Sequence, residues 1–234
     1  MNKTLIFGTM YLYNQEMVDI VKLWIDRVSS LGRDWLLIDS NSPKDLVDQL
    51  EIPKANLFTY KNNIGHLSKG GCDGWGRAFC RGIDFAILNN YENVVHIESD
   101  LLVAKKAFQK ELCAFEIQNT NKVQAPICVN IQTVNTPQGL VRSPKALEMV
   151  ETGLMLFKTA WAKEVNLVDK YDWTKVDRFP RPETRIKEIC KDVLVWFWVN
   201  KGKRLEGDAT TDGLLYITHS SYGVLFDFFR NTND

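Results

Sequence analysis

Short apolar runs alternate, in the first part of the chain, with segments whose apolar side chains recur every three or four positions. Residues 4–9 form an apolar run typical of a strand buried on both faces. Residues 14–31 have apolar positions along one face of a helix, with Asn14 as the expected N-cap and Gly32 as the expected stop. The same reasoning predicts a strand at 35–39, a short helix at 44–50 and a strand at 56–60.

The pattern continues beyond a glycine-rich loop at 62–76, with a helix carrying apolar residues between 78 and 87 and a strand at 93–98. This alternation predicts an α/β fold in which a mostly parallel sheet has helices on both faces. The second half of the chain is less regular. It predicts strands at 123–129, 153–157, 204–206 and 214–219 and a long helix at 182–200.

Composition limits the classes of function that fit. The 234 residues suit one α/β domain, and 45% of them are apolar. The 29 basic and 29 acidic residues balance, which argues against a nucleic-acid partner. The five cysteines form no CxxC pair, so we expect reduced thiols in a cytoplasmic protein. The apolar start and the run at 193–199 are both too short to be transmembrane segments.

The most informative segment is Glu98-Ser99-Asp100, which follows the apolar run VVHI. Ligands of open α/β sheets bind at the carboxyl ends of the strands. Two carboxylates leaving one strand end can share a hard cation, or one can hold the metal while the other holds a ribose hydroxyl. Mg²⁺ and Mn²⁺ prefer such ligands and keep coordination positions open for phosphate oxygens. The competing interpretation is that these acids only solvate a strand end.

The glycine-rich segment is a second candidate for ligand binding. Its glycines allow the backbone to approach a ligand, and the helix expected to begin near Asp73 or Trp75 offers unpaired amides to an anion. Arg77 in the first turn opposes the helix dipole, so we expect it to have an anionic or acidic partner. The segment has neither a GxxxxGK[ST] nor a GxGxxG pattern, and a plain surface loop remains the alternative.

The chain has three histidines. His96 lies inside a buried run, so we interpret it as structural. His219 ends an apolar run and is the better candidate for a ligand. An imidazole beside carboxylates would favour Mn²⁺ over Mg²⁺.

These segments, in this order, resemble the GT-A glycosyltransferases, whose fold is a Rossmann-like, mostly parallel sheet flanked by helices. Glu98-Ser99-Asp100 is similar to their Asp-X-Asp signature. The resemblance implies that Asp100 binds the divalent metal, Mn²⁺ or Mg²⁺, and that Glu98 contacts the metal or the donor. It also implies that His219 supplies a further metal ligand.

The N-terminal half resembles the family-two branch, which includes small viral and bacterial enzymes. Asp39 stands where that branch binds the base or ribose, and Asn63-Ile64-Gly65 and Gly76-Arg77-Ala78 match its donor-contacting elements. The resemblance implies donor binding by Thr9, Tyr11, Asp39, Asn63, Gly65, Trp75, Arg77, Glu98 and Ser99.

The segment at 191–206 resembles the family segment that begins with a catalytic Glu-Asp pair. Lys191 replaces the first acid, so Asp192 is the candidate general base, with Glu151 and Glu188 as alternatives. Residues 151–157 resemble the strand that lines the acceptor side. We favour an inverting mechanism, although a retaining one, which needs no such base, remains open.

We therefore expect one GT-A domain over residues 1–234, with the nucleotide sugar bound by about 1–103 and the acceptor by about 104–234. The expected reaction is metal-dependent sugar transfer from a UDP- or GDP-linked donor to a glycan, lipid-linked or protein-linked acceptor. A sugar-1-phosphate nucleotidyltransferase is the first alternative, although Thr9–Leu12 lacks its glycine-rich signature with arginine. A non-catalytic nucleotide-sugar-binding module is the second.

Overall fold

The computed structural model describes residues 3–65, 72–118, 123–129, 133–136, 139–142, 148–150, 152–174, 182–190, 194–198 and 216–218. Its centre is an eight-stranded sheet in the order β11-β6-β10-β4-β1-β2-β3, with β9 paired to β6. The parallel part consists of β1 (Thr4–Met10), β2 (Asp34–Asp39), β3 (Leu57–Thr59) and β4 (Asn93–Ile97). The expected α/β class and the helix-flanked sheet are confirmed.

The other half of the sheet contains antiparallel pairs. β10 (Leu154–Lys158) runs antiparallel to both β4 and β6 (Val123–Val129), and β9 (Glu148–Val150) runs antiparallel to β6. β11 (Leu194–Trp198) returns parallel to β6. Two small sheets complete the described strands, β5 (Leu101–Val103) with β12 (Tyr216–Thr218), and β7 (Thr133–Thr136) with β8 (Gly139–Arg142).

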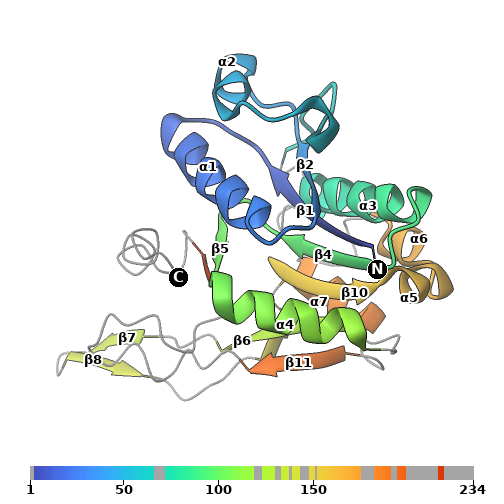
Figure 1. Cartoon of the computed structure of the whole chain (residues 1–234). Coiled ribbons are helices and arrows are strands. Elements are labelled where there is room, and N and C mark those ends of the chain that lie inside the picture. The colour runs from blue at the N-terminus through green and yellow to red at the C-terminus, as the bar shows by residue number, and fades with distance from the viewer. Residues whose placement is uncertain are drawn as a thin grey trace.

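Helices cover both faces of the sheet (Figure 1). Successive strand residues point to opposite faces, so Ile6 packs in one core cluster and Phe7 in the other. The first cluster includes residues of α1 (Gln15–Ser29) and α4 (Lys105–Ile117). The second includes residues of α3 (Cys72–Leu88), α5 (Thr159–Glu164), α6 (Leu167–Tyr171) and α7 (Pro182–Cys190). Short helical turns α2 (Lys44–Val47), η1 (Asp48–Leu50) and η2 (Lys54–Asn56) connect β2 to β3.

Two expectations about secondary structure were wrong. The long helix predicted at 182–200 is instead α7, which ends at Cys190, followed by the strand β11. The residues LVWFW of β11 are large and partly β-branched, types that fit a strand, and β6 supplies the parallel neighbour. The predicted strand at 204–206 lies outside the described residues.

The glycine-rich loop predicted at 62–76 was also too long, because Gly74 and Gly76 lie inside α3. Close packing explains these glycines. A Cβ on Gly74 would lie 2.7 Å from the Gly65 carbonyl oxygen, and a Cβ on Gly76 would lie 2.3 Å from the Tyr171 ring. Since α3 begins at Cys72, Arg77 lies beyond its first turn.

His96 is fully buried in β4, as expected for a structural histidine. Its Nδ1 lies 2.8 Å from the Thr152 carbonyl oxygen, which can only accept, so Nδ1 carries the proton. The ring packs 4.8 Å from Phe7 and 5.3 Å from Phe79, measured between ring centroids. Burial lowers the pKa of His96 to about 4, against the opposing effect of the Thr152 hydrogen bond.

This burial predicts a pH dependence of stability. Unfolded His96 has a pKa of about 6.5, so between about pH 4 and 6.5 the unfolded chain binds a proton that the folded protein does not. The free energy of unfolding should therefore fall with decreasing pH in this window, with His96 contributing up to about 1.4 kcal/mol per pH unit. Urea denaturation at several pH values measures this slope.

His96→Asn keeps an N–H donor but does not titrate, so its slope should be shallower than that of the wild type over the same window. Taking the difference between the two proteins removes the contributions of groups that titrate in both. Equal slopes would contradict the assigned protonation state of His96.

Candidate functional site

The carboxyl ends of β1, β2, β3 and β4 meet at one edge of the sheet. Met10 pairs with Asp39 and Asp39 with Thr59, so the three strands end side by side. The Ser40 amide donates to the Met10 carbonyl at 3.0 Å, and the Tyr60 amide to the Asp39 carbonyl at 2.9 Å. This is the edge at which open α/β sheets bind ligands. Strand ends at this edge carry several of the predicted donor-binding residues, namely Thr9, Tyr11, Asp39, Glu98 and Ser99.

Asp39 is fully buried at the end of β2 and organises the neighbouring loop. Its carboxylate accepts hydrogen bonds from the Ser42 amide, at 3.0 Å, and from the Ser42 hydroxyl. The Ser42 oxygen in turn accepts from the Leu12 amide at 2.7 Å. Burial raises the pKa of Asp39, and the Ser42 hydrogen bonds oppose that rise. Asp39 thus fixes the backbone beside Tyr11, whose side chain is 42% exposed.

Ser42 was not singled out from the sequence, although it lies three residues after Asp39. That spacing is typical of turns in which an aspartate side chain accepts a hydrogen bond from a nearby amide, so the sequence could have predicted the contact between Asp39 and Ser42.

Glu98-Ser99-Asp100 forms a turn between β4 and β5. The Leu101 amide donates to the Glu98 carbonyl at 3.0 Å, and the Glu98 amide donates to the Gly153 carbonyl at 2.8 Å. Ser99 is buried, whereas Glu98 and Asp100 are half-buried. The two acids therefore lie on a backbone fixed from both sides, at the edge where strands β1 to β4 end.

Trp75 joins this turn to helix α3. Its indole N–H donates to Glu98 Oε1 at 2.6 Å. The indole stacks on Phe79, with ring centroids 4.6 Å apart and an interplanar angle of 15°, and meets the His96 ring edge-on at 5.5 Å. The sequence predicted a role at the site for both Trp75 and Glu98, but not their direct contact.

Among the described residues, the partners of Arg77 are neutral groups and not an acidic side chain, and its contact with an anionic ligand stays a prediction. Its guanidinium donates to the Asn62 carbonyl at 2.8 Å and lies 3.8 Å from the centroid of the Tyr60 ring. The Tyr60 hydroxyl donates back to the Arg77 carbonyl at 3.1 Å. These contacts tie the segment after β3 to α3. Nε of the buried Arg77 side chain has no partner within the described residues.

Asn63 and Gly65 extend the same segment. Asn63 Oδ1 accepts from the Gly65 amide at 2.7 Å, and Gly65 has a φ of +58°, a conformation that glycine adopts without strain. Asn63 is exposed and Gly65 is half-buried, so both remain candidates for contact with a donor.

Several predicted site residues lie outside the described part of the chain, namely Asp192, His219 and Glu151. Glu188, the other alternative base, is exposed on α7. Thr218, the last residue of β12, pairs with Leu101, which directly follows Asp100. Within the described residues, no three His, Cys, Asp or Glu side chains are grouped closely enough to hold a metal ion.

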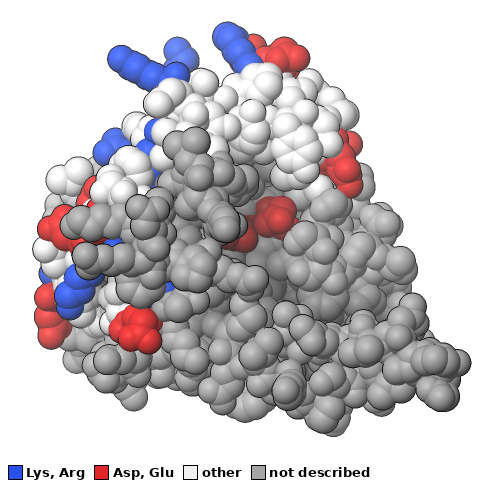
Figure 2. All heavy atoms as spheres, turned by 180° about the vertical axis from the view of Figure 1, so that it is seen from behind, with Lys and Arg blue, Asp and Glu red and all other residues white. Residues whose placement is uncertain are grey.

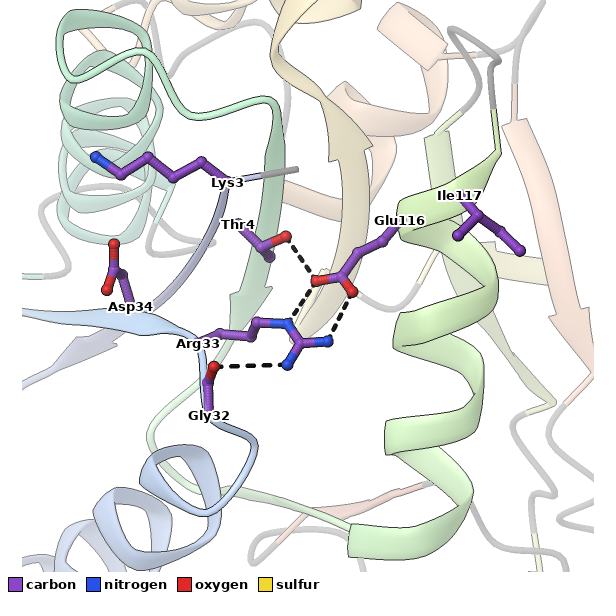
Figure 3. Close-up of a pocket in the computed structure, with 7 residues that line it drawn as sticks. All are labelled: Lys3, Thr4, Gly32, Arg33, Asp34, Glu116 and Ile117. Carbon is purple, nitrogen blue, oxygen red and sulfur yellow. Dashed lines mark hydrogen bonds and ion pairs between the residues drawn. The ribbon is translucent and has the colours of Figure 1, made fainter. Parts of the chain in front are cut away.

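A cavity of about 650 Å³ lies at the opposite edge of the sheet, where β1 and β2 begin (Figure 3). Arg33 forms a paired contact with Glu116, with Nε–Oε1 and Nη2–Oε2 distances of 2.6 and 2.7 Å. Thr4 also donates to this carboxylate, at 2.7 Å. Burial opposes the ionisation of Glu116, but the hydrogen bonds outweigh it and the pKa is lowered. The Arg33–Glu116 pair is therefore satisfied internally.

The described surface carries both signs of charge. In the view from behind, acidic and basic side chains are interspersed, and acidic side chains lie in a hollow near the centre (Figure 2). Among the described residues, no helix has the length and apolar character needed to cross a membrane.

Comparison with known proteins identifies the fold but not the family. No family model and no curated protein matches the sequence. A 4-diphosphocytidyl-2C-methyl-D-erythritolsynthase from Anaerococcus prevotii matches the structure with a TM-score of 0.54 and 14% identity, covering 84% of this chain and 87% of that chain.

Two further solved structures match. For a Bacillus anthracis protein assigned as a glucose-1-phosphate thymidylyltransferase, the TM-score is 0.53 and the identity 14%, with 99% and 96% of the two chains covered. A glycosyltransferase involved in glycosylation of the major capsid of PBCV-1 matches with a TM-score of 0.49 and 11% identity. The match covers 83% of this chain and 81% of that chain. The two structures with TM-scores above 0.5 show that this chain has a GT-A-like α/β fold.

Proposed function

We propose that this protein is a metal-dependent glycosyltransferase that uses a UDP- or GDP-linked sugar. The observation that carries the proposal is the Glu98-Ser99-Asp100 turn, fixed at the carboxyl edge of the parallel strands. Hard oxygen ligands at that edge suit a divalent cation bound together with a diphosphate. The fold, shared with enzymes of nucleotide-sugar chemistry, is consistent with this assignment.

The donor's nucleotide would lie across the ends of β1, β2 and β3. Tyr11 offers an exposed ring, and the segment from Asn63 to Gly65 offers backbone groups held in place by Arg77. Because Asp39 is buried, its main contribution would be to fix the loop beside Tyr11. Only the edge of the Asp39 carboxylate would contact a ribose or base.

The metal, Mn²⁺ or Mg²⁺, would be held by Asp100 with Glu98 and His219. The described residues fit this assignment through the β5–β12 pair. His219 directly follows Thr218, which pairs with the residue after Asp100. Because adjacent Cα atoms are about 3.8 Å apart, this pairing supports a shared site for His219 and Asp100. A divalent cation held there would stabilise the negative charge that develops on the leaving diphosphate.

The acceptor hydroxyl must lose a proton when the sugar is transferred. We assign this step to Asp192, which would act as general base in an inverting mechanism, and place the acceptor against residues of the 104–234 half. Glycan, lipid-linked and protein-linked hydroxyls remain the proposed acceptors, and the cytoplasm the proposed location.

A sugar-1-phosphate nucleotidyltransferase is the second candidate, because two structural neighbours with TM-scores above 0.5 are named as enzymes that make nucleotide-linked products. The two reactions are separable by their products. A glycosyltransferase releases UDP or GDP from a nucleotide sugar, whereas a nucleotidyltransferase releases pyrophosphate from a nucleoside triphosphate and a sugar 1-phosphate. Incubation with each substrate set and Mn²⁺, followed by chromatography, distinguishes them. Pyrophosphate without nucleoside diphosphate would reject the glycosyltransferase proposal.

Replacing Asp100 tests the metal assignment. Asp100→Ala should abolish the Mn²⁺-dependent stabilisation by UDP or GDP, which for the wild type is about 2.7 kcal/mol at 100 times the dissociation constant. Thermal unfolding with and without Mn²⁺ measures the effect. Asp26→Ala removes an exposed carboxylate from α1 and should leave the Mn²⁺-dependent shift unchanged. A normal shift in Asp100→Ala would contradict the assignment.

Replacing Asp192 tests the general base. Asp192→Asn keeps the size of the side chain but cannot accept the proton, so turnover should fall by about 10²–10⁴ while donor affinity stays near that of the wild type. Steady-state kinetics and donor calorimetry measure the two quantities. Glu188→Gln on α7 is the matched comparison. A larger fall in turnover for Glu188→Gln than for Asp192→Asn would assign the general base to Glu188.

A further inference from the structure

A hydrogen bond connects Trp75 of helix α3 to Glu98 of the acidic turn, Glu98-Ser99-Asp100. The indole N–H donates to Glu98 Oε1 at 2.6 Å, across 23 residues of sequence. A hydrogen bond to a carboxylate is charge-assisted and about twice as strong as one between neutral groups. It fixes one carboxylate oxygen of the first acid in Glu98-Ser99-Asp100.

The indole cannot turn away without disrupting the core. It stacks on Phe79 at 4.6 Å and contacts the His96 ring at 5.5 Å, and both of these residues are fully buried. Tyr171 adds a third ring, 5.7 Å away. The orientation of the N–H is therefore set by the packing of α3 on the sheet.

The backbone of Glu98 is held as firmly as its side chain. Its amide donates to Gly153 at 2.8 Å and its carbonyl accepts from Leu101 at 3.0 Å. His96, which touches Trp75, bonds to Thr152 next to Gly153. The start of β10, the end of β4 and the first turn of α3 thus meet at Glu98.

We propose that Trp75 is a positioning residue of the donor site, acting through Glu98 and not by stacking on the donor. This role rests on the proposed function, since it assumes that Glu98 faces a metal-bound diphosphate. It differs from the donor contact expected for Trp75 from the sequence. Trp75 would orient the carboxylate of a metal ligand. Loss of such an orienting partner typically weakens metal affinity or activity by about 10- to 100-fold.

The test is the affinity for UDP or GDP with Mn²⁺, measured by calorimetry. Trp75→Phe keeps a ring against Phe79 but removes the N–H, and should weaken this affinity by about tenfold or more. Trp161→Phe is the matched control, because Trp161 is a buried tryptophan on α5 whose indole nitrogen has no partner among the described residues. Trp161→Phe should bind UDP or GDP with wild-type affinity, even if it lowers the unfolding temperature as much as Trp75→Phe does.

A double-mutant cycle separates positioning from direct contact. In a Glu98→Ala background, Trp75→Phe should have no further effect on affinity, because the carboxylate it orients is absent. A further loss of similar size would mean that the indole touches the donor itself, and would overturn the proposal. Wild-type affinity in Trp75→Phe alone would overturn it as well, while leaving the proposed function intact if Asp100→Ala still abolishes binding.

A measurement on the folded wild-type side chain guards against loss of folding in Trp75→Phe. The Trp75 indole ¹H–¹⁵N resonance should shift when UDP or GDP is added with Mg²⁺, and should move in Glu98→Ala. An indole resonance unaffected by both changes would overturn the role. Failure of the wild type to bind either nucleotide with Mn²⁺ or Mg²⁺ would reject the proposed function and this role together.

Discussion

The complete enclosure of β1 is the constraint on which the rest of the structure depends. Its two edges are paired to β2 and β4, and its two faces are covered by α1 and α3. There is no space for larger side chains at these contacts. A Cβ on Gly8 would lie 2.7 Å from the Trp24 ring, and a Cβ on Gly82 would lie 2.4 Å from the Phe7 ring. The parallel pairing of β1 with β2 and β4 aligns the strand ends at a single edge, and both helices pack directly on this enclosed strand.

The same packing extends to the acidic turn. Trp24 of α1 reaches across Gly8 and donates to the Ile97 carbonyl at 3.2 Å, immediately before Glu98. Trp75 of α3 reaches Glu98 from the opposite face. Two tryptophans from the two helical layers therefore hold the end of β4, and the position of the carboxylates follows from core packing more than from the turn itself.

Polar groups buried near this edge are mostly paired, because an unpaired buried polar group costs about 1–3 kcal/mol. Asp39 uses Ser42, Arg77 uses Asn62, and His96 uses Thr152. Each pair ties a loop at the sheet edge to a strand or helix. A ligand bound there would meet loops that are already ordered, which lowers the entropic cost of binding.

The sequence alone determined the local elements. Apolar periodicity located β1, α1, β2, α3 and β4, and Asn14 caps α1 as expected, accepting from the Met17 amide at 3.0 Å. These features depend on residues a few positions apart, so a pattern read along the chain contains them. The acidic turn was recognisable for the same reason, since its position follows directly from the run before it.

Only the tertiary structure decided the features that depend on distant neighbours. LVWFW became a strand because β6 offered it a partner, and β10 lies antiparallel between β4 and β6. The neutral partners of Arg77 and the contact of Trp75 with Glu98 likewise join segments 15 and 23 residues apart. Such choices are set by which surfaces meet when the layers pack, and the periodicity of a short apolar run does not by itself distinguish a buried helix from a buried strand.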